Sequence, residues 1–378
     1  KPYGTDGEQG FHSRQDGEGR GMKSSAFGVR RSALKDRKNH ALAFMRICAV
    51  ACVMIIMLLA VYTEAGAQAA QKRGVGSPEK RIGDLEKDVM KLQREVDIFN
   101  LDAMPENLML CYKKIPIYRE DVRDRFEREL FQLLENKGLL TLIVKRYLQY
   151  MNMINEEIQK MALPSDLIYL AITESYLLPR SLSRANAAGI WQFIKETGKR
   201  EGLSINDHLD ERYNIKKSTR SALTHLKRLY GEFGDWLIAM AAYNAGPARL
   251  KEAIEHQGTR DFLDLYLPEE TERYIFRILA MKEIILNRER YGIRVDEKEL
   301  YKPLSLVEVA FETDREIHTN ILAKAMELPY RTFRTYNLQI RKYRLPKGAY
   351  RINVPAEKKE AFLKHLKGYE YIQVVKEN

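Results

Sequence analysis

The chain has 378 residues, 45% of them hydrophobic, so it is long enough to bury at least one large core, and its length predicts two domains. Its formal net charge is +11, but residues 1–46 carry ten basic and five acidic side chains and so contribute +5 of it. The remaining excess is mild and suits an anionic polymer as partner. Because no basic stripe with interleaved aromatic residues is present, we expect no nucleic-acid binding.

The N-terminal part combines a polar tail with an apolar segment. Residues 1–46 are rich in Gly, Arg and Ser, which predicts a disordered basic tail. Residues 47–61 form an apolar run, and a small-residue site, Ala65-Gly66-Ala67, follows it. Residues 47–67 therefore predict a signal peptide cut after Ala67, or an uncleaved signal anchor that associates with the membrane through the apolar run. In both cases we expect export to the periplasm or cell envelope.

The cysteines predict neither a disulfide framework nor a metal site. Cleavage of the signal segment would leave Cys111 alone, so no intrachain disulfide could form. No Cys or His spacing is typical of a metal site, and we expect no metal and no cofactor. A domain of this size can rely on its core instead.

Residues 68–103 predict a linker followed by a short heptad helix. Apolar residues recur there at steps of three and four, at Ile82, Leu85, Val89, Leu92, Val96 and Phe99. Such a seam is typical of a coiled coil, but about three heptads are marginal on their own. We expect a helical spacer that dimerises weakly through residues 82–99 or lies back on the next domain.

From residue 104 to residue 295 the hydrophobic pattern is helical almost throughout, which predicts a core of helix packed on helix. Pro164-Ser165-Asp166 marks the start of one helix. Gly246-Pro247 marks the end of another, which carries Tyr243 and Asn244 in its last turn.

One carboxylate continues the apolar stripe of the helix that starts after Asp166. Leu167, Leu170 and Ala171 lie on one face, and Glu174 follows at i+7. Taken alone, such a Glu is more often a partly exposed helix-end residue or half of an ion pair. If it is buried, desolvation disfavours its charged form, and Glu174 should keep its proton towards neutral pH and be able to donate it.

Several short motifs surround Glu174 in a fixed order. They are Glu174-Ser175, Pro179, Ser183, Ala188-Gly189-Ile190-Trp191-Gln192-Phe193, Thr197-Gly198, Ala242-Tyr243-Asn244-Ala245-Gly246 and Glu270-Thr271-Glu272-Arg273-Tyr274. Together they resemble the motifs of the family 1 lytic transglycosylases, which have an SLT domain. The resemblance implies a mainly α, lysozyme-like (goose-type/SLT) catalytic domain over residues 104–295. It departs at Lys195, where the family usually has proline.

The resemblance also implies a reaction, cleavage of the MurNAc-GlcNAc β-1,4 bond of peptidoglycan strands. Ordinary glycosidases need two carboxylates, but no Asp or Glu lies between Ser175 and Lys195. A single acid suffices if Glu174 first protonates the glycosidic oxygen while the N-acetyl group of the sugar supports the oxocarbenium-like centre. Glu174 then acts as a base on the 6-hydroxyl, which closes on the anomeric carbon to give a 1,6-anhydroMurNAc end without water.

The family motifs imply six substrate-binding residues: Ser183, Gln192, Ile194, Tyr243, Asn244 and Tyr274. The side chains of Ser183 and Gln192 offer hydrogen bonds to sugar hydroxyl and amide groups, and Ile194 gives a sugar ring an apolar floor.

The other three lie on two later helices. Tyr243 and Asn244 are implied to hold the N-acetyl group, and Tyr274 to hydrogen-bond Glu174. By position alone, each tyrosine would more often pack its ring in the core and bond its hydroxyl to backbone.

Residues 300–378 predict a small α+β region. Strands are expected at residues 306–309 and 350–355, with helices at residues 320–326 and 330–337 between them. This order resembles a LysM glycan-binding module; the alternative is an accessory cap packed on the catalytic domain. Residues 356–378 add a charged helix and an apolar segment that predicts an edge strand.

Two rival functions remain open. A goose-type lysozyme would hydrolyse the same bond and needs an Asp that directs water, for which Asp207 and Asp210 are the distant candidates. A non-catalytic peptidoglycan-binding protein would keep Gln192 and Tyr243 but has no need of Glu174.

Overall fold

The structure, a computed structural model, describes residues 82–90, 105 and 107–375. The chain divides into two units, residues 1–92 and residues 93–378. In the first unit residues 82–90 are helical, as the heptad pattern predicts, and Ile82 and Leu85 of the seam are exposed. The predicted tail, the signal segment and the second half of the heptad seam lie outside the described residues. Among the residues described, no helix has the length and hydropathy to span a bilayer.

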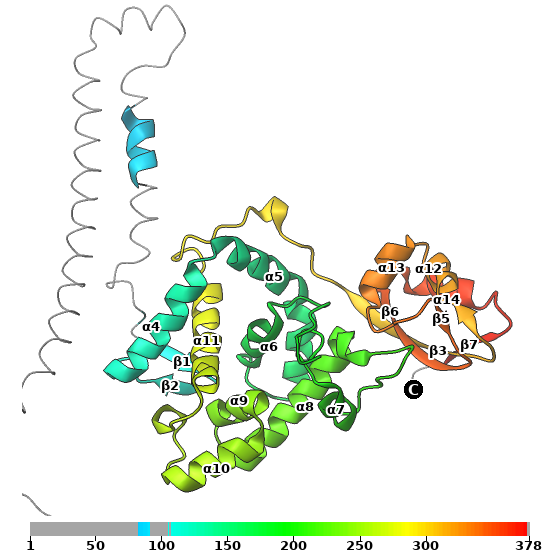
Figure 1. The fold of residues 1–378 in the computed structure, drawn as a ribbon. Coiled ribbons are helices and arrows are strands. Elements are labelled where there is room, and N and C mark those ends of the chain that lie inside the picture. The colour runs from blue at the N-terminus through cyan, green and yellow to red at the C-terminus, as the bar shows by residue number, and fades with distance from the viewer. Residues whose placement is uncertain (1–81, 91–104, 106, 376–378) are drawn as a thin grey trace, which may run out of the picture. The chain divides into compact units, whose positions relative to one another are not determined.

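Residues 107–293 form a helical domain with one small hairpin (Figure 1). Its elements are β1 (Leu108–Leu110), β2 (Lys113–Ile115), α4 (Glu120–Leu134), α5 (Lys137–Lys160), α6 (Leu167–Ser175), α7 (Lys195–Arg200), a 3₁₀ turn (Glu211–Tyr213), α8 (Ile215–Phe233), α9 (Trp236–Ala245), α10 (Pro247–Gln257), a 3₁₀ turn (Phe262–Asp264) and α11 (Glu269–Leu286). The mainly α prediction is therefore confirmed, although the hairpin is not part of it.

Helix α6 is the buried helix of this domain. The side chains of residues 167–172 are all buried, so the helix is apolar on every side and packs against α5 and α11. Helix α11 also packs against α4 and α9, and α9 against α8. The expected boundaries hold, since α6 begins after Asp166 and α9 ends at Gly246, which has φ +87° and is followed by Pro247 at the start of α10.

The hairpin β1–β2 fastens the starts of two helices. Asp166, just before α6, accepts hydrogen bonds from the backbone N–H of Cys111 (2.7 Å) and from Lys282 Nζ of α11 (2.8 Å). Lys113 of β2 pairs with Asp235, the N-cap residue of α9, at 2.9 Å. The hairpin is thus joined by charge-assisted hydrogen bonds to the beginnings of α6 and α9.

Residues 306–375 form the predicted α+β region. Its elements are β3 (Leu306–Thr313), β4 (Ile317–His318), α12 (Asn320–Ala325), α13 (Tyr330–Tyr336), β5 (Arg344–Leu345), β6 (Gly348–Pro355), α14 (Lys359–Leu366) and β7 (Ile372–Val375). The predicted strands and helices occur in the predicted order, with two further short strands, β4 and β5, that were not predicted, and β3 pairs antiparallel with both β6 and β7. The apolar segment near the C-terminus is an edge strand, as expected, because β7 pairs only with β3 in the sheet order β6-β3-β7.

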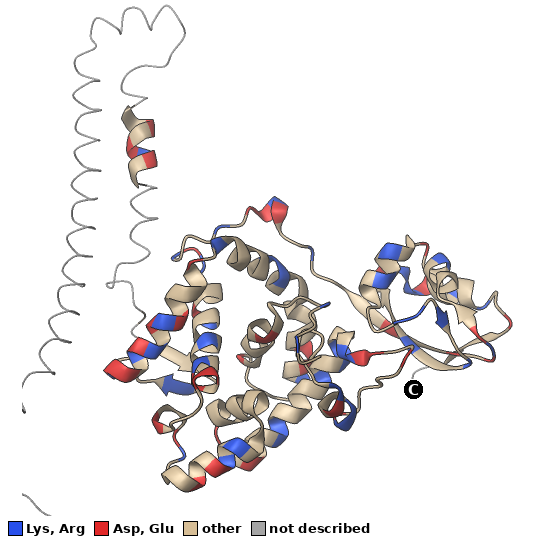
Figure 2. Cartoon of the chain, in the orientation of Figure 1, with Lys and Arg blue, Asp and Glu red and all other residues tan. Residues whose placement is uncertain are grey.

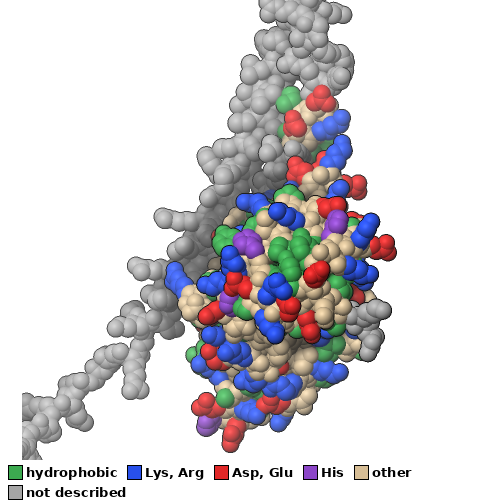
Figure 3. Space-filling view, turned by 90° about the vertical axis from the view of Figure 1, so that its right-hand side faces the viewer, with side chains coloured by type: hydrophobic (Ala, Val, Ile, Leu, Met, Phe, Trp, Pro, Cys, Tyr) green, Lys and Arg blue, Asp and Glu red, His purple; other side chains and the backbone are tan. Residues whose placement is uncertain are grey.

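Charge is mixed on both regions. Both positive and negative residues are spread over the helices and loops (Figure 2). On the face of the molecule shown in Figure 3, hydrophobic side chains gather at the centre, and positive side chains are interspersed with negative ones around them. No extended stripe of a single charge is visible on that face.

The loop between α6 and α7 packs closely on the segment that follows it in sequence. Gly189 in this loop has φ +78°, and a Cβ added there would lie 1.9 Å from the carbonyl oxygen of Arg212. Glycine is required at this position because the backbone of the loop lies directly against the backbone of Arg212 and leaves no room for a side chain.

We predict that Gly189→Ala lowers the free energy of unfolding by about 3 kcal/mol, since it combines a backbone clash with a strained φ. Urea unfolding measures this change. The matched control is Gly202→Ala, where φ is +86° but nothing lies within 4 Å of the added Cβ, so that strain alone should lower stability by about 1 kcal/mol. Equal losses in the two variants would contradict the proposed clash.

Candidate active site

Glu174 lies in the last turn of α6, beside the loop that leads to α7. The helix ends abruptly because Tyr176 and Leu177 both adopt the left-handed conformation, at φ 52° and 50°. Ser175 donates a hydrogen bond to the carbonyl oxygen of Ile190 at 2.9 Å, which joins the end of α6 to the loop. The carboxylate is therefore held on a helix whose end is fixed.

The surroundings of Glu174 favour its protonated form. Burial raises the pKa of Glu174 to about 7, because the protein solvates a carboxylate less well than water does. Tyr274 on α11 donates a hydrogen bond to its Oε1 at 2.5 Å, and this bond, with the positive charge of Arg277, opposes the rise in pKa. The negative charge of Glu270 adds to the rise.

A second buried carboxylate, Glu129 of α4, forms an ion pair with Arg277. Its two oxygens accept hydrogen bonds from Arg273 Nε at 2.5 Å and Arg277 Nε at 3.0 Å, on either side of Tyr274 in sequence. Arg277 is thus paired with Glu129, which reduces the net positive charge near Glu174. We did not predict this group from the sequence, although Glu129 follows Phe126 by three residues on the apolar side of α4, the same signal that singled out Glu174.

Tyr243 and Asn244, in the last turn of α9, have different environments. The hydroxyl of Tyr243 donates to the carbonyl oxygen of Trp191 at 2.7 Å, and its ring packs near Phe193 and His225. Burial and the negative charge of Glu174 both raise the pKa of Tyr243, so this hydroxyl is close enough to sense the carboxylate. The partly exposed amide of Asn244 makes no hydrogen bond to any residue that the structure describes and is free to bind a ligand.

The side chains of Ser183 and Gln192 are positioned by hydrogen bonds to backbone groups of the loop between α6 and α7. Ser183 Oγ accepts the N–H of Ala187 at 3.0 Å, which leaves its O–H proton free to donate. Gln192 donates through Nε2 to the carbonyl oxygen of Gly189 at 2.7 Å, which leaves its side-chain carbonyl as an acceptor. Ile194, at the start of α7, is 45% exposed, as an apolar floor for a sugar ring would be.

The structure brings some of the predicted residues together directly. Tyr274 contacts Glu174, and the hydroxyl of Tyr243 lies within range of its charge. Gln192 adjoins Trp191, whose carbonyl Tyr243 binds. Within the part of the chain that the structure describes, Ser183, Ile194 and Asn244 make no hydrogen bond with Glu174. Their roles remain predictions.

A buried ion pair is hydrogen-bonded to the loop between α6 and α7. Arg212 binds both oxygens of Asp210, through Nε at 2.9 Å and Nη2 at 2.8 Å. Its Nη1 donates to the carbonyl oxygens of Asn186 at 2.7 Å and Phe193 at 3.0 Å. Both oxygens of Asp210 are therefore engaged in a structural ion pair.

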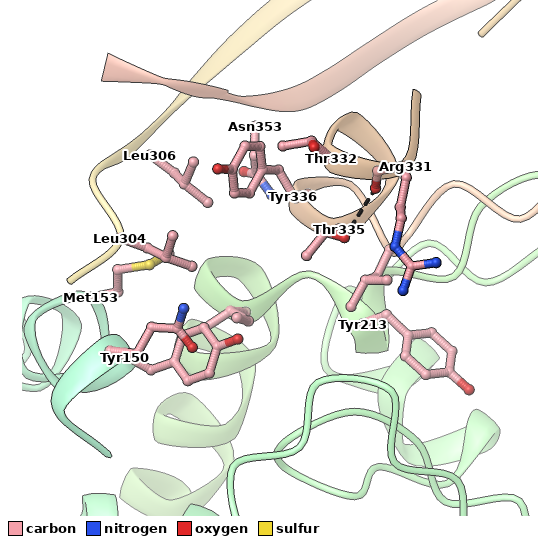
Figure 4. Close-up of a pocket in the computed structure, with 13 residues that line it drawn as sticks. Tyr150, Met153, Tyr213, Leu304, Leu306, Arg331, Thr332, Thr335, Tyr336 and Asn353 are labelled. Carbon is pink, nitrogen blue, oxygen red and sulfur yellow. Dashed lines mark hydrogen bonds between the residues drawn. The ribbon is translucent and has the colours of Figure 1, made fainter. Parts of the chain in front are cut away.

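The cavity in Figure 4, of about 310 Å³, lies elsewhere. Its walls come from α5, from residues 304–306 and from α13, with Tyr213 and Arg331 at one end. It contains none of the predicted site residues. Within the described ranges, no cluster of three or more His, Cys, Asp or Glu side chains has the arrangement to hold a metal ion.

Comparison with known proteins defines the class of the helical domain. Residues 151–265 match the family model of the Transglycosylase SLT domain. Over 192 residues the chain is 38% identical to the Membrane-bound lytic murein transglycosylase D of Escherichia coli, an alignment that covers 50% of this chain and 42% of that relative. Residues 151–265 are therefore similar to an SLT domain, as the motifs predict, and the chain spans less than half the length of this relative.

Other similarities are more limited. Over 113 residues the chain is 35% identical to the Peptidoglycan transglycosylase gp16 of Escherichia phage T7, which covers 29% of this chain and 8% of the phage protein. Among solved structures, the 70 kDa soluble lytic transglycosylase Slt70 of Escherichia coli matches with a TM-score of 0.34 and 17% identity, over 60% of this chain and 38% of the other.

The raised pKa of Glu174 predicts a pH-dependent gain in stability for Glu174→Gln. The unfolded carboxyl ionises near its ordinary pKa of 4.5 and the folded one near 7, so the folded state loses stability as the pH rises through this window. The side chain is partly exposed, and solvent screening reduces the free energy that corresponds to the pKa shift. Between pH 4 and pH 8 the stability of Glu174→Gln relative to wild type should therefore increase by about 2 kcal/mol. Urea unfolding of both proteins at the two pH values measures this; the same difference at both would contradict the raised pKa.

Proposed function

We propose that this protein is a peptidoglycan lytic transglycosylase that cleaves the MurNAc-GlcNAc β-1,4 bond and leaves 1,6-anhydroMurNAc ends, with Glu174 as its acid and base. The observation that supports this best is the environment of Glu174, where burial raises the pKa to about 7 and Tyr274 binds one oxygen. The SLT match and the similarity to proteins named as murein and peptidoglycan transglycosylases support the substrate class.

In the first step Glu174 donates its proton to the glycosidic oxygen, the bond to the anomeric carbon breaks, and the leaving sugar departs with that proton. A carboxyl group with a pKa near the working pH is suited to this step, because an appreciable fraction is protonated and still acidic enough to react. The N-acetyl group of the substrate supports the positive charge on the anomeric carbon.

In the second step the carboxylate of Glu174 accepts the proton of the 6-hydroxyl as its oxygen bonds to the anomeric carbon. The acid is regenerated and no water enters the product. The hydrogen bond from Tyr274 stabilises Glu174 in its charged form between the two steps. The free amide of Asn244 and the side-chain carbonyl of Gln192 would bind the N-acetyl and hydroxyl groups of the sugar.

The lysozyme alternative requires a carboxylate that directs a water molecule. Asp210 is unsuited to this role because both its oxygens bind Arg212, and Asp207 is an exposed residue of a segment outside the loop that contacts α6. A non-catalytic binding protein would gain nothing from a carboxyl group with a raised pKa, and burying one lowers stability.

The place of action in the cell follows from the N-terminal sequence. We infer export to the periplasm or cell envelope through residues 47–67, with membrane association if the apolar run is retained, and weak self-association through residues 82–99. For residues 300–378, the order strand, helix, helix, strand supports a LysM-like glycan-binding module, with an accessory cap as the alternative.

The deciding experiment is mass spectrometry of fragments released from purified peptidoglycan by wild type and by Glu174→Gln. Wild type should release fragments lighter by one water molecule than those with reducing ends. Glu174→Gln should lower kcat by at least about 1,000-fold while still binding peptidoglycan, because it removes one proton and almost no volume. Reducing ends would make the protein a lysozyme, and binding without products a non-catalytic protein.

The pH dependence of kcat provides an independent test. Because the acid form of Glu174 starts the reaction, kcat should fall as the pH rises through about 7. Tyr274→Phe removes the hydrogen bond that holds this pKa down, so the fall should move to higher pH even if kcat itself decreases. A Tyr274→Phe profile with its fall at the wild-type pH would show that a different group limits the rate.

A further inference from the structure

A groove lined by lysines lies between α7 and the start of β6. It is lined by Lys195 and Lys199 of α7, by residues 205–209, and by Pro346, Lys347 and Tyr350, and its volume is about 560 Å³. We call it the lysine groove. Backbone hydrogen bonds fix its floor, from Arg341 N to the carbonyl oxygen of His208 at 2.7 Å and from Asp210 N to that of Gln339 at 2.8 Å. The groove is thus built from two segments that are bonded together.

The lysines of this groove have no acidic partner among the residues that the structure describes. Lys195, Lys199 and Lys347 are all exposed, and in the described part of the chain none of them forms an ion pair. Other lysines of the same domain, such as Lys113 and Lys145, each contact a carboxylate. The acidic side chain in the lining is Asp207, so the groove has an excess of positive charge.

The groove continues the chain segment that is predicted to contact the sugar. Lys195 follows Ile194, whose exposed side chain is the expected apolar floor, and Lys199 lies one helical turn further along α7. The groove therefore begins at the residue after Ile194 in sequence, and Lys195 and Lys199 stand one turn apart on the same side of α7.

We infer that the lysine groove binds carboxylates of the peptides attached to the glycan strand, and so favours peptide-bearing strands over naked ones. This inference rests on the proposed function for its substrate class. The sugar hydroxyl and N-acetyl groups are neutral and gain little from an ammonium group, whereas a peptide carboxylate gains a charge-assisted hydrogen bond. The apolar side chains of Ile205, Leu209 and Tyr350 in the lining suit the aliphatic parts of such a peptide.

Binding measurements on catalytically inactive protein test the groove separately from cleavage. In a Glu174→Gln background, the dissociation constant is measured for peptide-bearing strands and for strands stripped of their peptides, whose newly exposed sugar carboxylates are blocked as neutral amides. The triple variant Lys195→Gln, Lys199→Gln, Lys347→Gln should lower the preference for peptide-bearing strands about tenfold. A rise in salt from about 0.05 M to about 0.5 M should reduce the wild-type preference similarly.

The matched control is the triple variant Lys227→Gln, Lys359→Gln, Lys367→Gln. These lysines are also exposed and without a recorded ion pair among the described residues, but they lie outside the groove, so the preference should stay at the wild-type value. An unchanged preference in the groove variant, or an equal loss in both variants, overturns the inference. If the groove variant alone loses preference while wild type releases no anhydro products, the proposed function fails and the groove assignment stands.

Discussion

The buried pair of Arg212 and Asp210 is the interaction on which the arrangement of the candidate site depends. One guanidinium satisfies both oxygens of the carboxylate and also two carbonyl groups of the loop after α6, so its charge is balanced and four of its five N–H donors are used. Loss of either partner would leave the other charge buried and unpaired. The carbonyl oxygen of Arg212 also lies where a side chain at residue 189 would be, so the same residue determines how closely the loop packs.

The proton affinity of Glu174 results from opposing effects, of which burial is the largest. Burial raises its pKa, while the hydroxyl of Tyr274 and the guanidinium of Arg277 lower it. Glu129 shares Arg277 and so reduces its effect, which links α4 to chemistry on α6 through a residue of α11. A free guanidinium nearby would lower the pKa of Glu174 further and leave less of it protonated at neutral pH; without Tyr274, the pKa would be higher and Glu174 would be a weaker acid in the first step.

The sequence predicted those parts of the structure that depend on local pattern. The helical domain, the boundaries of α6 and α9, and the helices and longer strands of residues 306–375 follow from apolar periodicity and from Gly, Pro and Asp at element ends, whereas the two-residue strands β4 and β5 are too short to leave such a pattern. The hairpin β1–β2 was missed because its turn, Cys111-Tyr112, lacks the Asn or Gly that usually signals two left-handed residues. The contact between Tyr274 and Glu174 came from family motifs alone, since residues 100 positions apart leave no local signal.

The roles of Glu129 and Arg212 were not predicted, for a different reason. A charged side chain in a helix or a turn usually faces solvent, and only the three-dimensional structure shows which ones are buried with partners. Glu129 is 1% exposed and Arg212 7% exposed, yet each lies among other charged residues in the sequence. Their importance follows from contacts with residues more than fifteen positions away, on which local periodicity carries no information.

The hairpin has a consequence for the limits of the domain. The family match begins at residue 151, but Asp166 and Asp235, at the starts of α6 and α9, find their partners in Cys111 and Lys113. A fragment cut at residue 151 would leave these carboxylates without those partners and would uncover the face of α11 that α4 protects. A segment able to fold and be exchanged between proteins as a module thus has to include the hairpin from Leu108 onwards, some forty residues before the family match begins.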